Sequence, residues 1–207
     1  MTTRMMALRF LLGAGVLAVV PVTSGKATEP PGRFEVVAVA ERKLTRLPAG
    51  PLYWRVESLP TLADAQARAA AHPTALAAEV AGRAWLVTLD AKGGTTPGAT
   101  RHAEIGPVPM IRAEEYLLRL NRAGGPAGAR TPTHTHPGSE AFYVISGRLG
   151  QKTPAGTAYA EAGQALNGHD GDTPMEVFSA GPAELAQLVM FVVDAGRPFS
   201  SPAKLPH

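Results

Sequence analysis

Two histidines and a glutamate near the middle of the chain have side chains that bind metal ions. His134 and His136 are separated by one residue, so on a β-strand both imidazoles point to the same face. The turn-forming residues 137–139 follow, and Glu140 then begins an apolar run that reaches Ile145. This order predicts a strand, a tight turn and a second strand, a hairpin that brings Glu140 back beside the two imidazoles. Two neutral nitrogens and one carboxylate oxygen form a divalent-metal site with open positions.

The spacing of these residues resembles the first conserved motif of the cupin superfamily. Gly128 lies six positions before His134, and Gly147 lies seven positions after Glu140, as that motif requires. The resemblance implies that His134, His136 and Glu140 are metal ligands inside a double-stranded β-helix, the jelly-roll barrel of that superfamily. The alternative is a solvated loop that contains histidines, and it leaves the glutamate, both glycines and the following strand unexplained.

The resemblance weakens at the second cupin motif, whose histidine supplies the fourth metal ligand. Gly171 fits the register of that motif, but Pro174 stands where the ligand histidine belongs and His169 stands where the motif has proline. One interpretation makes His169 the fourth ligand, carried inward by a re-shaped glycine-containing turn. A second leaves two histidines and one carboxylate as the ligand set, with His169 at the mouth of the site. A third makes His169 an exposed loop residue without a role.

The first 27 residues have the layout of a secretory signal peptide. Arg4 and Arg9 precede an apolar core over residues 10–20, and the small residues Gly25 and Ala27 frame a cleavage site. The core is short for a bilayer span, so we expect a cleaved, exported and periplasmic protein without stable membrane association. An uncleaved N-terminal anchor is the alternative.

Charge and cysteine content narrow the possible partners. The chain has 20 basic and 17 acidic residues, and Arg4, Arg9 and Lys26 all lie in the targeting segment, which has no acid. The remainder is therefore balanced in charge, which does not favour nucleic acid or an anionic membrane as a partner. The absence of cysteine excludes disulfides and thiolate ligands, so a hydrophobic core must stabilise the fold.

Strands and one helix are expected in the first half of the chain. The expected strands cover residues 34–40, 52–58 and 83–89. An alanine-rich helix is expected from Leu62 to about Ala71, with Thr61 as its N-cap. Pro73 ends this helix, and residues 74–81 are expected to add a second helical turn or two.

The second half of the chain contains only strand and turn signals. Besides the metal motif, the expected strands cover residues 116–121, 148–152, 157–160, 174–179 and 185–194. Residues 185–194 are almost continuously apolar, which is typical of a strand buried on both faces. Short strands joined by regular turns are typical of a sandwich or barrel.

These patterns predict a mainly β fold, a jelly-roll barrel with an N-terminal α+β extension. The alternative for residues 33–110 is a degenerate second cupin half, which would bind no metal because it has no His-x-His pair. The predicted division is a signal peptide at 1–27, an extension at 28–110 that packs on the barrel, the cupin barrel at 111–195, and a proline-rich surface tail at 196–207.

Several side chains are candidates for lining the barrel. Alternation places Phe142 on the face of Glu140 and Tyr143 on the opposite face, so Phe142 is the better pocket candidate. The remaining candidates, each with plain core packing as the alternative, are Tyr159, Met175, Met190 and Phe191, together with the polar Arg130 and Gln151.

The site chemistry predicts a class of reaction without naming a substrate. The expected cofactor is a divalent transition metal, one of Fe, Mn, Ni, Cu or Zn, and the expected partner is a small organic molecule. The leading hypothesis is an exported cupin enzyme, a dioxygenase or decarboxylase. The alternatives are a metal-containing module that binds a ligand without turnover, and a barrel in which zinc serves stability only. The resemblance also implies a homodimer.

Overall fold

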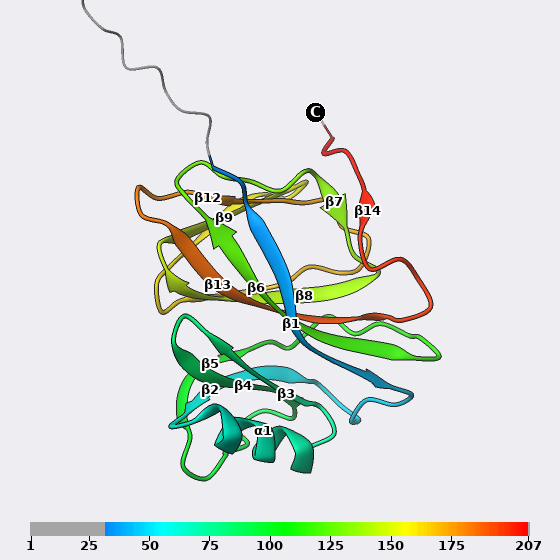
Figure 1. Ribbon diagram of the computed structural model, residues 1–207. Coiled ribbons are helices and arrows are strands. Elements are labelled where there is room, and N and C mark those ends of the chain that lie inside the picture. The colour runs from blue at the N-terminus through cyan, green and yellow to red at the C-terminus, as the bar shows by residue number, and fades with distance from the viewer. Residues whose placement is uncertain (1–31, 207) are drawn as a thin grey trace, which may run out of the picture. The chain divides into compact units, whose positions relative to one another are not determined.

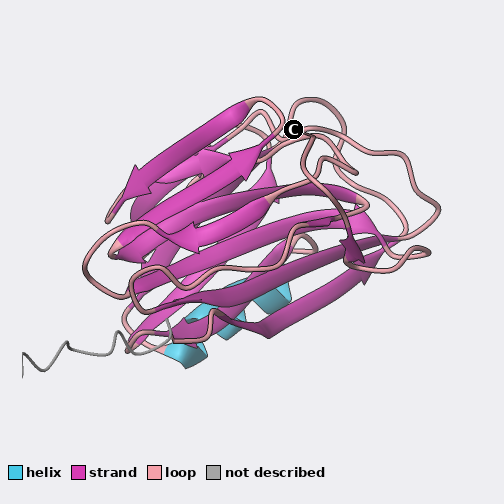
Figure 2. Cartoon of the chain, turned by 90° about the horizontal axis from the view of Figure 1, so that it is seen from above, coloured by secondary structure: helices cyan, strands magenta, loops and turns pink. Residues whose placement is uncertain are grey.

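The computed structural model describes residues 32–206, which fold mainly as antiparallel β-strands. Figure 2 shows strands throughout the described part, with a single helix on one side. The prediction of a mainly β jelly-roll class is therefore confirmed. The predicted signal peptide, residues 1–27, lies outside the described residues. Within residues 32–206, no helix has the length and apolar character needed to cross a membrane.

A large sheet forms the centre of the fold. In spatial order it holds β1 (Glu35–Leu44), β6 (Tyr116–Gly125), β13 (Leu185–Asp194), β8 (Gly138–Ser146) and β11 (Ala165–Asn167). Opposite its inner face lie β10 (Gly156–Glu161), β9 (Arg148–Thr153) and β12 (Glu176–Ser179), and the short pair β14 (Ser201–Pro202) and β7 (His134–Thr135). Apolar side chains from both sheets share one core, so the two sheets enclose a barrel interior (Figure 1).

The outer face of the large sheet packs on a second, four-stranded sheet. That sheet holds β3 (Ala75–Val80), β4 (Arg83–Asp90), β2 (Tyr53–Leu59) and β5 (Thr100–Ile105), in this order. A second core fills the space between the two sheets and includes Trp54, Trp85 and Met190. The helix α1 (Leu62–Ala71) covers the far face of the four-stranded sheet, so the layers follow one another as in Figure 1.

Strand β13 is buried on both faces, as its continuous apolar pattern predicted. Val189 and Phe191 point into the barrel core, whereas Leu188 and Met190 point into the core shared with the four-stranded sheet. Each fully buried side chain of this size contributes about 1.5–3 kcal/mol of transfer free energy. The strand therefore joins the two cores, and the barrel depends on both.

Two strands in the segments that flank the predicted barrel pair with barrel strands. Strand β1 lies in the segment assigned to the extension, yet it pairs with β6 along the barrel sheet, from Glu35 opposite Gly124 to Leu44 opposite Tyr116. The tail predicted to lie on the surface contains β14, which pairs with β7. Both strands cover backbone groups of β6 and β7 that would otherwise form open sheet edges. Sequence order alone does not reveal these long-range pairings.

Residues 75–80 form strand β3, so the prediction of further helical turns over residues 74–81 is wrong. Alanine has a high helix propensity, but tertiary pairing decides this segment. Ala81 and Gly82 both have positive φ, 51° and 68°, the geometry of a two-residue hairpin turn that leads directly into β4. The indole of Trp85 then donates a hydrogen bond to the Val80 carbonyl across this turn.

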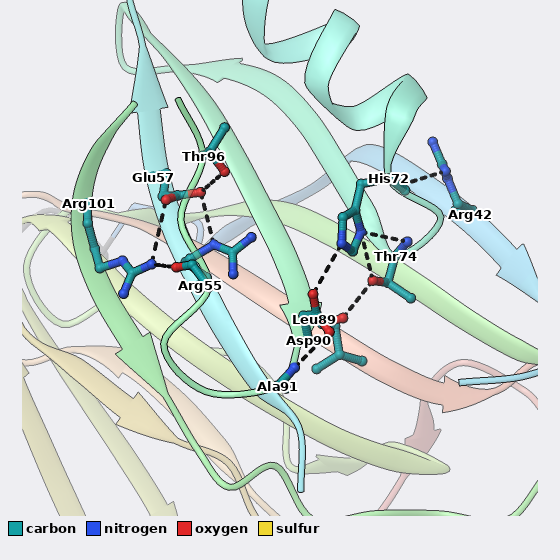
Figure 3. Close-up of polar contacts among 11 residues, drawn as sticks. Arg42, Arg55, Glu57, His72, Thr74, Leu89, Asp90, Ala91, Thr96 and Arg101 are labelled. Atoms are coloured by element: carbon teal, nitrogen blue, oxygen red, sulfur yellow. Dashed lines mark hydrogen bonds and ion pairs between the residues drawn. The ribbon is translucent and has the colours of Figure 1, made fainter. Parts of the chain in front are cut away.

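Helix α1 begins and ends as its sequence predicts. The Thr61 hydroxyl accepts a hydrogen bond from the Asp64 amide at 3.1 Å, which confirms the predicted N-cap. At the other end, the Arg42 guanidinium donates to the carbonyls of Ala69 and His72, where a positive charge complements the helix dipole. The His72 ring contacts Asp90 at 3.2 Å (Figure 3), which ties the end of the helix to β4.

A buried ion pair holds the glycine-rich loop at residues 91–99 against the four-stranded sheet. The Glu57 carboxylate, 2% exposed, accepts hydrogen bonds from Arg55 at 3.1 Å and from the Thr96 hydroxyl at 2.6 Å. Figure 3 shows these contacts, with Arg101 as a further cation 3.8 Å from the same carboxylate. Because both partners are buried, removing either one would leave an uncompensated charge.

The metal motif does not form the predicted hairpin. Strand β7 pairs with β14 and forms a bridge from His134 to Met175, whereas β8 pairs with β13 and β11. The chain therefore crosses from one side of the barrel to the other at Pro137. Gly138 permits this crossing, because a Cβ at this position would overlap the Val192 backbone of β13.

We expect Gly138→Ala to lower the free energy of unfolding by about 1–3 kcal/mol, because backbone atoms of β13 cannot move aside as a flexible side chain would. The measurement is urea unfolding followed by circular dichroism. Gly196→Ala is the control, since its new Cβ would meet only the Asp194 carboxylate, at 3.2 Å. Equal stability of the two variants would contradict a tight approach of β8 to β13.

Candidate metal centre

A cavity of about 370 Å³ opens on the inner face of the large sheet. This volume suits a small organic molecule. Its walls are mainly apolar, and the C-terminal segment that contains Phe199 closes one side. His134, His136 and Glu140 all line this cavity, whereas His169 is not among its lining residues. The structure thus brings the three residues of the first motif to one pocket.

Both motif histidines are anchored through the same ring nitrogen. Nδ1 of His134 lies 2.8 Å from the Pro132 carbonyl, and Nδ1 of His136 lies 2.6 Å from the Phe199 carbonyl. A carbonyl oxygen only accepts hydrogen bonds, so Nδ1 must carry the proton in both rings. In its neutral form each ring therefore keeps a free lone pair on Nε2, which is the arrangement of metal-bound histidines.

His136 is held deep in the pocket by aromatic side chains. It is 4% exposed, and its ring centroid lies 4.8 Å from that of Phe191 and 4.7 Å from that of Phe199. Burial lowers its pKa to about 4, with smaller contributions from His134 and Arg119, although the Phe199 carbonyl acts in the opposite direction. His136 is therefore neutral at physiological pH and able to act as a ligand.

Glu140 is a buried acid without a cationic partner in the described part of the chain. Its Oε1 accepts a hydrogen bond from Gln151 Nε2 at 2.9 Å, and its Oε2 lies 3.9 Å from His136 Nε2. Burial raises the pKa of Glu140 to about 8, and the Gln151 hydrogen bond offsets only part of that shift. Since burial favours the neutral forms of both Glu140 and His136, their contact is not an ion pair.

The chemistry of this donor set fits a divalent cation. Two ligand atoms that are each about 2.1 Å from one ion lie at most about 4.2 Å apart. The 3.9 Å between His136 Nε2 and Glu140 Oε2 is within this limit, and the His134 ring lies beside that of His136 with centroids 4.9 Å apart. Within residues 32–206, no three His, Asp or Glu side chains are already grouped as an ion site. Metal binding accordingly stays a prediction.

His169 lies on the other side of Gln151 from the predicted ligands. Its Nε2 is 3.2 Å from Gln151 Oε1, so Gln151 connects His169 with Glu140. The neighbouring Gly168 is packed directly on the Glu140 backbone, where a Cβ would overlap the carbonyl oxygen. This close packing keeps His169 near the site without placing it in the pocket. Its role as fourth ligand stays a prediction.

The structure shows which of the other candidate residues line the pocket. Phe142 lines the pocket beside Glu140, as alternation predicted, and Phe191 lines it as well. Tyr143 and Met190 face the core on the other side of the sheet, and Tyr159 is 48% exposed. Sequence reasoning missed Phe199, because nothing in a proline-rich tail signals that it closes a pocket.

Comparisons with known proteins leave the family unassigned. No family model matches the chain, and no curated protein matches it. Solved structures match only in part. A structure of the DMSP lyases RdDddP and RnDddQII matches with 21% identity and a TM-score of 0.37, over 42% of this chain and 44% of that chain. The polyketide cyclase RemF from Streptomyces resistomycificus matches with 22% identity and a TM-score of 0.36, over 43% and 62%.

A cupin-like protein from Thermotoga maritima also matches, with 16% identity and a TM-score of 0.38, over 42% of this chain and 65% of that one. In each case the match spans less than two thirds of the other protein. Similarity this partial says nothing about what the pocket binds, so the assignment of function has to come from the geometry of the site.

We expect Glu140→Gln to raise the free energy of unfolding in EDTA at pH 8 by a few kcal/mol. The folded acid has a pKa of about 8 against about 4.5 for an ordinary glutamate, so its contribution to stability falls as the pH rises through this interval. The difference between variant and wild type should shrink as the pH falls towards 5. Chemical unfolding between pH 5 and 9 measures it.

Glu161→Gln, which changes an exposed carboxylate outside the pocket, is the control for this titration. It should show no comparable dependence on pH. A constant difference between Glu140→Gln and wild type across this range would mean that Glu140 is ionised in the folded protein.

Proposed function

We propose that the chain is an exported, metal-dependent protein of the cupin superfamily, an enzyme of the dioxygenase type that acts on a small organic molecule. His134, His136 and Glu140 hold a divalent transition metal, with His169 as the candidate fourth ligand. The observation that carries the proposal is the pairing of two Nδ1-anchored imidazoles with an uncompensated buried acid in one apolar cavity.

The energetic argument begins with Glu140. A buried carboxylate without a cation is unstable, and a divalent ion beside it would favour the ionised form. His136 needs no deprotonation to bind, because its pKa is already lowered to about 4. The carbonyls of Pro132 and Phe199 keep both rings oriented with Nε2 free. Forming the ligand set therefore costs the protein little side-chain conformational entropy.

When bound, an iron, manganese, nickel or copper ion supplies redox or Lewis-acid chemistry at positions left open by the protein ligands. The chain's own part is to bind and orient the substrate and to exclude water. Phe142, Phe191 and Phe199 line the cavity beside the ligand set and provide the apolar surroundings. Gln151 orients Glu140 through its hydrogen bond to Oε1.

The second candidate is a metal-containing module that binds a small ligand without turnover. It is favoured by the departure at Pro174, because an altered second motif removes the usual fourth ligand. A barrel that uses zinc only for stability is the third. Both alternatives have the same predicted metal site as the enzyme, but neither converts a substrate into a product.

Metal content tests the site directly. We expect the purified wild-type protein to contain about one divalent ion per chain and His134→Ala to lose at least tenfold in affinity, because one of three donors is gone. Elemental analysis after dialysis and calorimetric titration measure both. His72→Ala is the matched control, since His72 is outside the pocket and contacts Asp90. Full occupancy in His134→Ala would remove the basis of the proposal.

The same measurements on His169→Ala decide between the interpretations of the fourth ligand. Loss of affinity comparable to that of His134→Ala would support direct coordination. If His169→Ala keeps full occupancy and affinity, the ion is held by the two motif histidines and Glu140 alone.

Enzyme and binding module are distinguished by turnover. For the enzyme, we expect oxygen uptake with at least one compound of a panel of diols, flavonols and oxalate, and loss of that uptake in Glu140→Gln. An oxygen electrode and product analysis make the measurement on metal-loaded protein. Saturable binding without oxygen uptake or product would favour the module, and a metal without exchangeable water would favour structural zinc.

Export and assembly belong to the same proposal. We expect a processed N-terminus near Thr28 in a periplasmic extract and a homodimer in solution. N-terminal sequencing and light scattering measure these, and full-length protein in the cytosol would contradict export.

A further inference from the structure

Two amide side chains in the pocket wall have atoms without partners. Asn121 on β6 is 2% exposed and Gln187 on β13 is 1% exposed, and both line the cavity. Asn121 Oδ1 and both amide atoms of Gln187 form no hydrogen bond within the described part of the chain. Leaving such a buried group unpaired destabilises the folded protein, because the group has lost its hydrogen bonds to water. A third amide in the barrel, Gln151, is partnered at both ends, by Glu140 and His169.

Strand register places the two amides at increasing distance from the predicted metal ligands. On β13, Phe191 pairs with Glu140, Val189 pairs with both Phe142 and Asn121, and Gln187 pairs with Val144. Alternate residues of one strand are about 7 Å apart. Asn121 therefore lies about 7 Å and Gln187 about 13 Å along the sheet from the row that contains Glu140. The two amides form a polar patch at the far end of the cavity.

The surroundings of this patch restrict what it binds. Gln187 presents both a donor and an acceptor, and Asn121 presents an acceptor. Within residues 32–206, the cavity lining contains no lysine or arginine, and the side chains around the patch on this side are Ala123, Phe142 and Val189. Gln187 also borders a second hollow, in which Arg33 and Arg122 are balanced by Glu35 and Glu184. A charged group there would be desolvated without a counter-ion, which is costly. A neutral group that both donates and accepts meets the requirement.

We propose that Asn121 and Gln187 form a recognition subsite for the uncharged polar end of the substrate. The substrate class is a mainly apolar molecule whose carboxamide or hydroxyl group reaches the amides, one to two rows of the sheet away from the row that contains Glu140. Its apolar body lies along Phe142 and Val189. This subsite rests on the proposed function, because it binds the far end of the substrate whose near end faces the predicted metal ligands.

The test compares three probes that share one phenylpropyl carbon skeleton: 3-phenylpropanamide, 3-phenylpropanoate and propylbenzene. We expect the wild-type protein to bind the amide more tightly than the carboxylate at pH 7.5. In Gln187→Leu and in Asn121→Leu, the ratio of amide to propylbenzene affinity should fall about tenfold, since the amide loses a partner that the hydrocarbon never had. Calorimetric titration in EDTA measures the affinities.

Gln164→Leu is the matched control, because Gln164 is an exposed amide in the turn before β11. It should leave the ratio unchanged. Gln187→Leu should melt at the wild-type temperature or above it, because leucine removes an unpaired buried amide. An unfolded Gln187→Leu would show that the amide is needed to stabilise the fold, and would overturn the proposal. An unchanged ratio of amide to propylbenzene affinity in the leucine variants would also overturn it, as would tighter binding of the carboxylate by the wild-type protein.

Repeating the titrations in His134→Ala separates this subsite from the metal site. Preference for the amide should persist there, because the patch lies away from His134. If elemental analysis finds no metal in any variant while the preference is seen, the proposed cofactor fails and the subsite stands. If metal binds as expected and the preference is absent, only the subsite fails.

Discussion

The burial of Glu140 is the constraint on which the rest of the site depends. A carboxyl group at 3% exposure, with a single amide hydrogen bond and a neutral imidazole 3.9 Å away, holds its proton up to a pH of about 8. Such a group destabilises the fold whenever it ionises, and leucine or methionine would fill the same space without that cost. Its presence therefore points to a use for the carboxyl group, and in the proposed function a metal ion is its cationic partner.

The two cores explain how the fold tolerates this acid. Strand β13 contributes apolar side chains to both faces of the central sheet, so the packing against the four-stranded sheet and α1 stabilises the sheet independently of the pocket. The inner face is then free to carry polar groups such as Glu140, Asn121 and Gln187 among aromatic residues. In this view the N-terminal sheet serves the site as its support, although it contributes no residue to the predicted ligand set.

Local patterns predicted most elements, and long-range pairing decided what the sequence did not show. Alternation predicted β2, a short apolar run predicted β4, and continuous apolarity predicted β13. Thr61 predicted the start of α1. The three motif residues reach one pocket as their spacing indicated, yet by a crossing between sheets instead of a hairpin. Alanine-rich β3 is a strand instead of the predicted helical turns, because its pairing with β4 outweighs the helix propensity of alanine. The role of Phe199 depends on a contact across 63 positions, which no local pattern encodes.

The anchoring of His136 by Phe199 couples the orientation of this imidazole to the position of the C-terminal segment. The carbonyl that fixes the ring lies 63 positions along the chain from it, and Phe199 also lines the cavity. A change that displaces this segment would therefore release the imidazole and remove one wall of the pocket at the same time.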